Sequence, residues 1–545
     1  QLANFAPAAP DEPGTHAHRR SRRPMQQRPM SEPSDLLAIP GVVKLVRLFL
    51  EHFGEQRQEV LLLGGARTGR LREGRIALLE ATAAVREGNW KVDPVPAELL
   101  ERRVELIGGC SSREIVEGLN SGAKSYVADL WGMTAAGPAP APWAYQHLVL
   151  AATRQLGYTG TDGELVRINP GSTTRLMIAL RPLLVEDHAF LGTEATVPGC
   201  FVDLAMVGWH CGRALTERQG GIFLYLRGIR SHQEARLWNG LFDLTEKQLG
   251  LPAGTIRATV VVDSLCAALD ADEILHELRH HSAGTALAPQ AYTADHIALF
   301  STPDRAALPD RRHIGLNARF LRSVSLRTIG ISHRRGAHAM GAPAFVLPPV
   351  SKDGIDPDYL EMIADKEREA VDGHDGTLVA HPGLVNAAMA EFNKSMPMAH
   401  QMDYRPAGPA SLEDLALWPE GELTTAGIQN CIRTVIKVMV GLQAGQGMVV
   451  QGGPLHDRSS VRLATLLLWH WAQSKRCFIT ATGLEIHNEM MKYLIRKEAE
   501  KIYAQAGAEL QERARQAGLW LTDVVLCPEV PSDELEVRIL PAVKE

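Results

Sequence analysis

The sequence has no apolar run long enough to cross a membrane and no excess of basic residues. Its longer apolar stretches are interrupted, as residues 36–50 are by Pro40, Lys44 and Arg47, whereas a spanning helix needs roughly 20 apolar residues. Acidic residues outnumber basic ones by 63 to 57, which gives a net charge of −6. Nucleic acids and anionic membranes attract positively charged surfaces, so we expect neither as a partner.

Cysteine is also scarce, and its spacing forms no metal or redox motif. There are seven cysteines, an odd number, and no two form a Cys-x-x-Cys pair. Disulfide-stabilised secreted proteins show dense, even-numbered cysteine patterns. We therefore expect reduced thiols and a cytoplasmic protein. The cysteines lie at positions 110, 200, 211, 266, 431, 477 and 527.

The first 35 residues lack the composition of a folded segment. They are rich in Pro, Ala, Arg and Gln, and the basic run at 16–23 is not followed by an apolar stretch. A secretory signal would need such a stretch. We interpret residues 1–35 as a disordered extension or as sequence upstream of the true start, with Met25 and Met30 as candidate first residues.

The rest of the chain is long enough for several structural units. Its 45% hydrophobic and 22% charged residues are typical of a soluble globular protein. Helical periodicity at 35–53 and 56–87 predicts an N-terminal helical clasp over 36–100. Long periodic stretches at 425–443, 457–473 and 485–517 predict a C-terminal helical domain over 385–545, which can cover the mouth of the preceding unit.

Between these helical parts, short β-rich runs alternate with amphipathic segments. The helical segments include 112–121, 233–249 and 270–281. Alternation of this kind over about 250 residues is typical of an α/β barrel. We therefore predict a TIM (β/α)8 barrel over 101–384, with active-site residues at the C-terminal ends of its strands. The predicted strands are 104–107, 125–128, 165–168, 222–226, 258–262, 296–300 and 326–331.

Several motifs, in order along the chain, resemble those of the A-type malate synthases. The resemblance implies a TIM barrel with an N-terminal helical clasp and a C-terminal helical plug. It also implies condensation of acetyl-CoA with glyoxylate, the malate synthase step of the glyoxylate cycle, with Mg²⁺ as the cofactor. The motifs lie at 103–109, 118–129, 231–238, 272–278, 333–341, 365–370 and 374–385.

Asp457 matches the aspartate that serves as the general base in this family. It lies in the stretch Gly-Gly-Pro-Leu-His-Asp at 452–457. The resemblance implies that its carboxylate removes a proton from the acetyl methyl group, which is a weak acid and needs a positioned base. Aspartate is also a favoured helix N-cap residue, and Arg458-Ser-Ser reads as a helix start. The two roles can coexist.

The positions that should bind the acceptor substrate differ from the family pattern. The catalytic arginine of the family falls at Ser112, with Arg113 beside it as the alternative arginine. A family glutamate falls at Trp131, which we expect to line the pocket or to belong to the core, and another falls at Arg230. Arg230 is either an ordinary ion-pair partner or a cation that replaces lost positive charge and binds a carboxylate or a CoA phosphate.

The metal ligands of the family are altered as well. Asp263 stands at the position of the ligating glutamate, and Ala291 stands at that of the second ligand, an aspartate. Mg²⁺ prefers carboxylate and water oxygens, so Asp263 alone is a poor ligand set. Gly284 and Thr285, in the same segment as Ala291, are expected to contact substrate. The resemblance therefore predicts an acceptor half that is rebuilt, with Mg²⁺ binding in doubt.

A further motif suggests different chemistry. His276-Glu-Leu-Arg-His280 fits the HExxH pattern of zinc proteases, but the corresponding family helix lies on the barrel exterior and no third ligand follows. We interpret it as a solvent-facing helix.

The sequence thus supports two hypotheses. The first is an acyl-CoA-dependent transferase that joins acetyl-CoA, or another acyl-CoA, to glyoxylate or another 2-oxo acid. The alternative is a catalytically inactive homologue that binds CoA or a protein partner. The acceptor, the acyl chain and the oligomeric state are left open.

Overall fold

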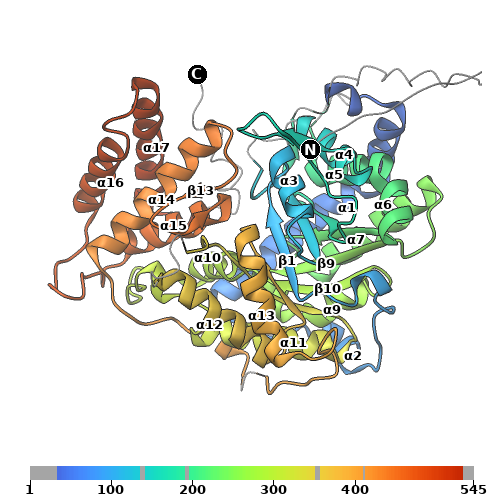
Figure 1. The fold of residues 1–545 in the computed structure, drawn as a ribbon. Helices are drawn as coiled ribbons and strands as arrows, with labels where there is room; N and C mark the ends of the chain where they lie inside the picture. The colour runs from blue at the N-terminus through green and yellow to red at the C-terminus, as the bar shows by residue number, and fades with distance from the viewer. Residues whose placement is uncertain are drawn as a thin grey trace, which may run out of the picture.

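A closed barrel of eight parallel strands forms the centre of the molecule (Figure 1). The computed structural model describes residues 33–134, 142–188, 190, 196–349, 356–408 and 411–531, so the predicted extension lies almost entirely outside the described residues. The predicted TIM barrel is confirmed. Going round the barrel in order, the strands are β1 (Val104–Gly108), β12 (Gly376–Val379), β11 (Ala339–Ala344), β10 (Ser282–Leu287), β9 (Ile256–Val262), β8 (Ile222–Leu226), β5 (Arg175–Ala179) and β2 (Ser125–Asp129).

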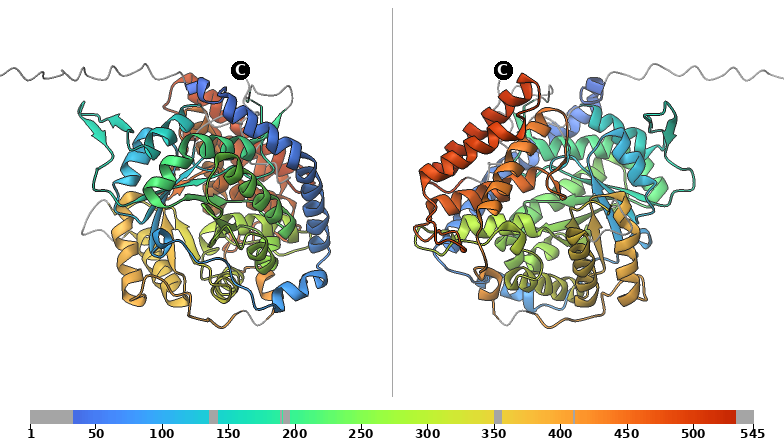
Figure 2. Two further views of the ribbon diagram at one scale, coloured as in Figure 1. Left: turned by 90° about the vertical axis from the view of Figure 1, so that its right-hand side faces the viewer. Right: turned by 60° about the vertical axis from the view of Figure 1, so that its left-hand side comes forward.

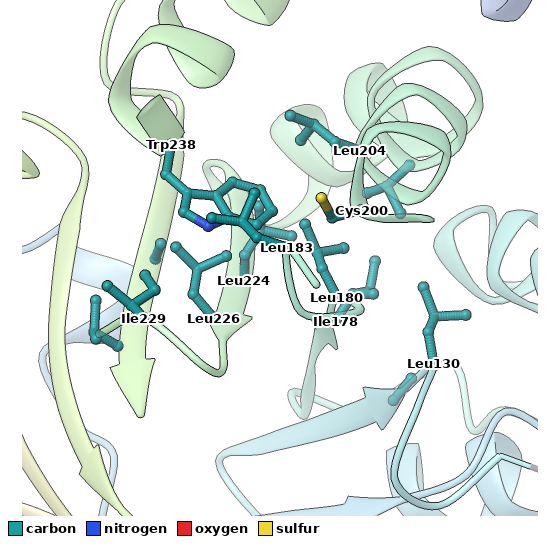
Figure 3. Packing of buried hydrophobic residues seen from close by; sticks show 14 of the residues in the cluster. Leu130, Ile178, Leu180, Leu183, Cys200, Leu204, Leu224, Leu226, Ile229 and Trp238 are labelled. Carbon is teal, nitrogen blue, oxygen red and sulfur yellow. The ribbon is translucent and has the colours of Figure 1, made fainter. Parts of the chain in front are cut away.

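Helices surround the barrel and cover its outer face (Figure 1). Alternate strand residues point outward, so apolar side chains on the strands meet the apolar faces of these helices. Figure 3 shows part of this core, where leucines of β8 and the loop after β5 meet Trp238 and Cys200. The surrounding helices are α3 (Ser112–Leu119), α4 (Pro142–Ala152), α5 (Gly199–Met206), α6 (Gly212–Gln219), α7 (His232–Leu249), α8 (Leu265–Leu269), α9 (Ala271–Glu277), α10 (Pro289–Phe300), α11 (Arg319–Arg334), α12 (Pro357–Asp372) and α13 (Val385–Ser395).

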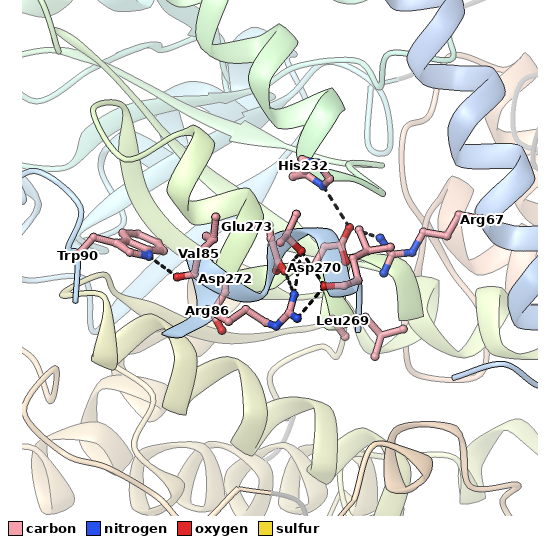
Figure 4. Close-up of polar contacts among 12 residues, drawn as sticks. Arg67, Val85, Arg86, Trp90, His232, Leu269, Asp270, Asp272 and Glu273 are labelled. Atoms are coloured by element: carbon pink, nitrogen blue, oxygen red, sulfur yellow. Dashed lines mark hydrogen bonds and ion pairs between the residues drawn. The ribbon is translucent and has the colours of Figure 1, made fainter. Parts of the chain in front are cut away.

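The N-terminal clasp is one long helix followed by shorter pieces. Helix α1 (Pro40–Arg72) runs along the outside of the barrel (Figure 2) and packs on α7, where the sequence predicted two helices. The segment η2 (Glu80–Thr82) and helix α2 (Ala83–Glu87) follow. Buried ion pairs tie the clasp to the barrel: Arg67 binds Asp270, and Arg86 binds Glu273 (Figure 4).

The C-terminal domain has its own apolar core and rests on the barrel. Its helices are predominantly amphipathic and bury Ile, Leu and Val side chains against one another. Helix α15 contacts α10 of the barrel, which joins the two units. The elements are α14 (Thr425–Gln443), the hairpin strands β13 (Val449–Val450) and β14 (Leu455–His456), α15 (Arg458–Gln473), α16 (Asn488–Ile502) and α17 (Ala508–Leu526).

Three of the predicted barrel strands are wrong. Residues 165–168 belong to an external hairpin, in which β4 (Leu165–Arg167) pairs with β3 (Gly157–Thr159). Residues 296–300 end helix α10, and residues 326–331 lie inside α11. A short apolar run fits a buried helix as well as a strand. Strands β10 and β11 are rich in Ala and Gly, and β12 has only four residues, so they gave a weaker signal. Strand β5 was also missed, although it is as long as β1.

Two expectations about the chain as a whole can be compared with the structure. All seven cysteines are free thiols, and all but Cys527 are buried. No helix in the described part of the chain is long and apolar enough to cross a membrane.

Candidate functional site

A cavity of about 350 Å³ lies at the mouth of the barrel, beneath the C-terminal domain. Its floor is formed by the C-terminal ends of several strands, including Ile107 of β1, Val261 of β9 and Leu378 of β12. Residues from Pro454 to Leu463 of the C-terminal domain form the opposite wall. This is the end of a TIM barrel at which active sites are found. The floor is apolar, whereas charged side chains line the walls.

Asp457 lines this cavity and is carried there by the β13–β14 hairpin. The turn of the hairpin contains Gly452 and Gly453, whose φ angles of +68° and +112° fall in the region that favours glycine. The backbone N–H of Leu455 donates to the carbonyl of Phe345, at the end of β11, over 2.8 Å. The hairpin is therefore attached to the barrel itself, and it places Asp457 over the strand ends.

The carboxylate of Asp457 is buried and is held on one side only. Its Oδ1 accepts hydrogen bonds from the Ser460 N–H (3.0 Å), the Ser459 hydroxyl (2.7 Å) and the Ser460 hydroxyl (3.1 Å). Asp457 is thus the N-cap of α15, as the sequence predicted. Its hydrogen bonds to described residues all fall on Oδ1, so a carboxylate that caps a helix still has a second oxygen to accept a proton.

A guanidinium group occupies the barrel mouth near the end of β8. Arg227 lines the cavity, and its Nη2 lies 2.9 Å from Asp129 Oδ2 in an ion pair. A Cβ atom added to Gly132 would lie 2.7 Å from Arg227 Nη1. The absence of a side chain at Gly132 therefore leaves the space in which the Arg227 guanidinium lies.

Asp263 is buried at the end of β9 and lines the cavity. Its Oδ2 accepts a hydrogen bond from the Gly228 N–H over 2.7 Å. Burial raises the pKa of this carboxyl to about 6, against the opposing effects of the Gly228 N–H and the positive charges of Arg230 and Arg462. Burial also raises the pKa of Glu234, a neighbour of Arg230, to about 7. The Gly228 N–H and the two arginines thus offset only part of the cost of burying the Asp263 charge.

These residues do not fit the Mg²⁺ site that the resemblance implies. Ala291 also lines the cavity and offers no ligand atom. Asp129, a buried carboxylate at the end of β2, accepts from the N–H groups of Trp131 and Gly132 on Oδ1 and pairs with Arg227 on Oδ2. Mg²⁺ requires several oxygen ligands in octahedral geometry, and the positive charge of Arg227 beside Asp129 opposes the binding of a cation there.

Trp131 is buried, as a core position would be, and it is not among the residues that line the cavity. Its ring packs beneath the guanidinium of Arg458, the first residue of α15, with 4.1 Å between the guanidinium carbon and the ring centroid. The structure makes Trp131 a contact between the barrel and the C-terminal domain.

The candidate arginine positions after β1 also lie away from the described lining of the cavity. Ser112 is the first residue of α3, and the preceding Ser111 caps that helix together with Glu114. Arg113 is exposed and pairs with Glu117 on the surface of the same helix, with 2.8 Å between the charged atoms. Neither residue brings a positive charge to the cavity.

Three further sequence candidates contact protein groups rather than line the cavity. The charge of Arg230 acts on Asp263 and Glu234. Gly284 has φ +107°, and a Cβ there would lie 2.2 Å from the carbonyl oxygen of His338, so glycine permits a close approach of two strands. Thr285 hydrogen-bonds to Ser332 of α11 over 2.8 Å.

Sequence analysis missed two cavity-lining residues with polar groups near Asp457. Gln290 lies in the first turn of α10, and Arg311 begins the short helix η5 (Arg311–His313). Arg311 Nη2 donates to Gln290 Oε1 over 2.9 Å. An arginine in a Pro-Asp-Arg stretch resembles any surface loop, so only the folded chain reveals that it is enclosed.

Within the described part of the chain, one cluster has the geometry of a metal-ligand group, and it lies away from the cavity. Asp243 and Glu246 of α7 meet His281, which precedes β10 and therefore lies at the opposite end of the barrel. Glu246 accepts from two backbone N–H groups, which is a structural role. The HExxH stretch is not the single solvent-facing helix that we expected, because α9 ends at Glu277 and its first five residues are buried. His276 contacts Trp90 edge-on, whereas His280 pairs with Asp93.

Comparison with known proteins places these observations in a family context. Residues 176–416 match the model of the malate synthase TIM barrel domain. The chain is 33% identical to a malate synthase of Myxococcus xanthus over 79% of this chain and 80% of that protein. It is 29% identical to malate synthase A of Escherichia coli over 90% and 92%, respectively. Among solved structures, a malate synthase of Haloferax volcanii covers 76% of this chain and 98% of its own, with 14% identity and a TM-score of 0.44.

Proposed function

The chain belongs to the malate synthase family, and on that premise we propose that it condenses an acyl-CoA with a 2-oxo acid, using Asp457 as the general base. Acetyl-CoA and glyoxylate are the first substrates to test. The observation that carries the proposal is the position of Asp457, a buried carboxylate on the wall of the barrel-mouth cavity.

The proposed reaction begins at the carbon next to the thioester. Asp457 Oδ2 takes a proton from this carbon, and the electrons of the C–H bond form an enolate. The enolate carbon attacks the carbonyl carbon of the 2-oxo acid, whose oxygen becomes an alkoxide and takes up a proton. Water then hydrolyses the thioester and releases CoA. Ser459 and Ser460 hold Oδ1 and so orient the carboxylate throughout.

Arg227 is the proposed anchor for the acceptor. A 2-oxo acid carries a carboxylate, and a guanidinium binds a carboxylate through charge-assisted hydrogen bonds. Arg227 lines the same cavity as Asp457 and is held in place by Asp129. Because the surrounding residues do not fit Mg²⁺, the proposed steps use protein groups alone. The apolar floor, with Ile107 and Val261, limits water around the enolate.

Exchange of the acetyl methyl protons tests the proposal directly. The protein is incubated with acetyl-CoA in deuterated water, with and without glyoxylate or pyruvate, and deuterium incorporation and free CoA are measured. We expect exchange by the wild type and a loss of about 10²–10⁴-fold in Asp457→Asn. Binding of acetyl-CoA without any exchange would support the alternative, an inactive homologue that binds CoA, and would end the catalytic proposal.

A further inference from the structure

We propose that Arg311 is a second catalytic residue of this site, whose Nη1–H donates a hydrogen bond to the enolate oxygen formed opposite Asp457. This inference rests on the proposed function and assigns the group that stabilises its intermediate. When Asp457 takes the proton, the electron pair of the broken C–H bond is shared with the thioester oxygen. Arg311 keeps its own proton and stabilises the negative charge that develops on that oxygen.

The first observation is an unused donor inside the cavity wall. Arg311 Nη2 donates to Gln290 Oε1 over 2.9 Å and to Ser460 Oγ over 3.4 Å. Its Nη1 is enclosed and has no hydrogen-bond partner among the described residues. A guanidinium nitrogen that is shielded from water and unpaired is costly, so an acceptor that reaches it gains a strong hydrogen bond.

The second observation is the connection between this guanidinium and the base. The Ser460 hydroxyl lies 3.4 Å from Arg311 Nη2 and 3.1 Å from Asp457 Oδ1. One hydroxyl group therefore separates the two charged groups, and they do not form a direct ion pair. The methyl carbon and the oxygen of an acetyl thioester are only two bonds apart. A base and an oxyanion donor that serve the same acetyl group must be close neighbours in this way.

The backbone around Arg311 is firmly anchored. The preceding residue, Asp310, is buried and accepts hydrogen bonds from the Thr424 N–H (2.9 Å) and hydroxyl (2.7 Å), at the N-terminus of α14. The Asp310 N–H donates to the carbonyl of Glu422 over 2.8 Å. Arg311 is thus held by the C-terminal domain that carries Asp457. Fixed donors are what electrostatic stabilisation of an oxyanion requires.

The other positive groups of the cavity wall are less suited to this role. Arg227 is paired with Asp129, and Lys366 donates to Glu369 and to the Ala342 carbonyl. Arg312 is largely exposed.

The neighbouring histidine does not supply the missing charge either. His456 lines the wall beside Arg311, and burial lowers its pKa to about 3, so it stays neutral. Because Ser112 stands in place of the family arginine and carries no charge, Arg311 is the cation placed to stabilise the enolate.

The test compares Arg311→Met and Arg311→Lys with the wild type in the methyl-exchange assay. We expect exchange to fall about 10²–10³-fold in Arg311→Met, to recover partly in Arg311→Lys, and the dissociation constant for acetyl-CoA to change by less than about threefold. Arg319→Met is the matched control, because Arg319 is exposed and pairs with Asp414 away from the cavity. Wild-type exchange rates in folded Arg311→Met would overturn the inference.

A binding measurement separates failure of this inference from failure of the proposed function. S-carboxymethyl-CoA carries a stable oxyanion close to the position of the enolate oxygen. By calorimetry, we expect the wild type to bind it at least tenfold more tightly than CoA, and Arg311→Met to lose that preference. If the wild type prefers S-carboxymethyl-CoA over CoA but exchanges no methyl protons, Arg311 binds the oxyanion although the proposed reaction fails. If wild type and Arg311→Met bind S-carboxymethyl-CoA with equal affinity, or if neither ligand binds, the proposed role of Arg311 is wrong.

Discussion

The guanidinium carbon of Arg458 lies 4.1 Å from the centroid of the Trp131 ring. The ring belongs to the loop after β2 at the barrel mouth, whereas Arg458 begins α15 of the C-terminal domain, directly after Asp457. The Arg458 N–H also donates to the Gly132 carbonyl over 3.3 Å. This contact therefore determines how the helix capped by Asp457 meets the barrel.

Trp131→Ala should weaken the attachment of the C-terminal domain to the barrel. Truncating a buried aromatic side chain costs roughly 3–5 kcal/mol, and a desolvated cation–π contact contributes up to about 2 kcal/mol. We expect faster limited proteolysis in the connecting segment around 396–424 and faster exchange of backbone amide protons for deuterium at the start of α15. Trp131→Phe keeps an aromatic face and should lie close to the wild type. Identical protection of α15 in Trp131→Ala would contradict this account.

Much of the fold could be predicted because its signals are local. Helices α3, α7 and α14 carry clear apolar periodicity, and β1, β2, β8 and β9 are apolar runs bounded by polar segments. Strands β10 and β11 are rich in Ala and Gly, and Gly284 of β10 allows the His338 carbonyl close to the backbone. Such residues have low strand propensity. Only closure of the barrel selects these segments as strands.

The candidate site was predictable where a single residue defines it and not where distant residues combine. Asp457 could be identified from its motif, and it lies on the cavity wall. The position of Arg227 depends on the absence of a side chain at Gly132, 95 residues earlier, and no local pattern reveals such a relationship. Arg113 looked like a substitute only because the sequence does not show which way a helix faces.

Variants of Asp457 should separate its capping role from its proposed role as a base. Asn is as good an N-cap as Asp, whereas Ala removes the cap at a cost of about 1 kcal/mol. In denaturant unfolding, we expect the free energy of unfolding of Asp457→Asn to lie within about 0.5 kcal/mol of the wild type and that of Asp457→Ala to be lower. Methyl exchange should be lost in both variants. Full exchange in Asp457→Asn would show that the carboxylate acts only as a cap.

Gly132→Ala should disturb Arg227 without unfolding the barrel. The added Cβ would lie 2.7 Å from both Arg227 Nη1 and Asp129 Oδ2, so the ion pair must shift. We expect a KM for glyoxylate raised at least tenfold with acetyl-CoA affinity little changed. Gly65→Ala is the control, because a Cβ there meets nothing within 4 Å and alanine favours the helix by up to about 1 kcal/mol. An unchanged KM in Gly132→Ala would argue against Arg227 as the acceptor anchor.

Chelation should have little effect on the reaction. Because Arg227 occupies the mouth and Ala291 offers no ligand, we expect methyl exchange to stay within about twofold when EDTA replaces Mg²⁺. The double variant Asp263→Glu, Ala291→Asp should still bind Mg²⁺ weakly by calorimetry while Arg227 is present. Loss of exchange on chelation, restored by added Mg²⁺, would show that the cavity binds the cation despite its residues.

His296 should make the protein less stable in acid. Its ring is enclosed by Phe300, Phe320 and Trp418, with centroids 5.1, 4.9 and 5.4 Å away, and its Nε2 has no partner among the described residues. Burial, reinforced by the positive charge of Arg305, lowers its pKa to about 3. The unfolded chain takes up a proton near pH 6.5 that the folded chain cannot bind. Stability is therefore lost as the pH falls from 6.5 toward 3.

The variant His296→Phe removes this proton uptake and keeps an aromatic ring of similar size. Linkage gives about 1.4 kcal/mol per pH unit within the window, so the variant should lose roughly 2 kcal/mol less stability than the wild type between pH 7.5 and pH 5. Urea unfolding at the two pH values measures the difference. His280→Phe, at an exposed site, is the control and should follow the wild type.

His338 and His470, whose pKa values burial lowers to about 4, remain in the variant, so its stability should still decline in acid with a smaller slope. Equal slopes in wild type and His296→Phe would mean that His296 is protonated inside the folded protein.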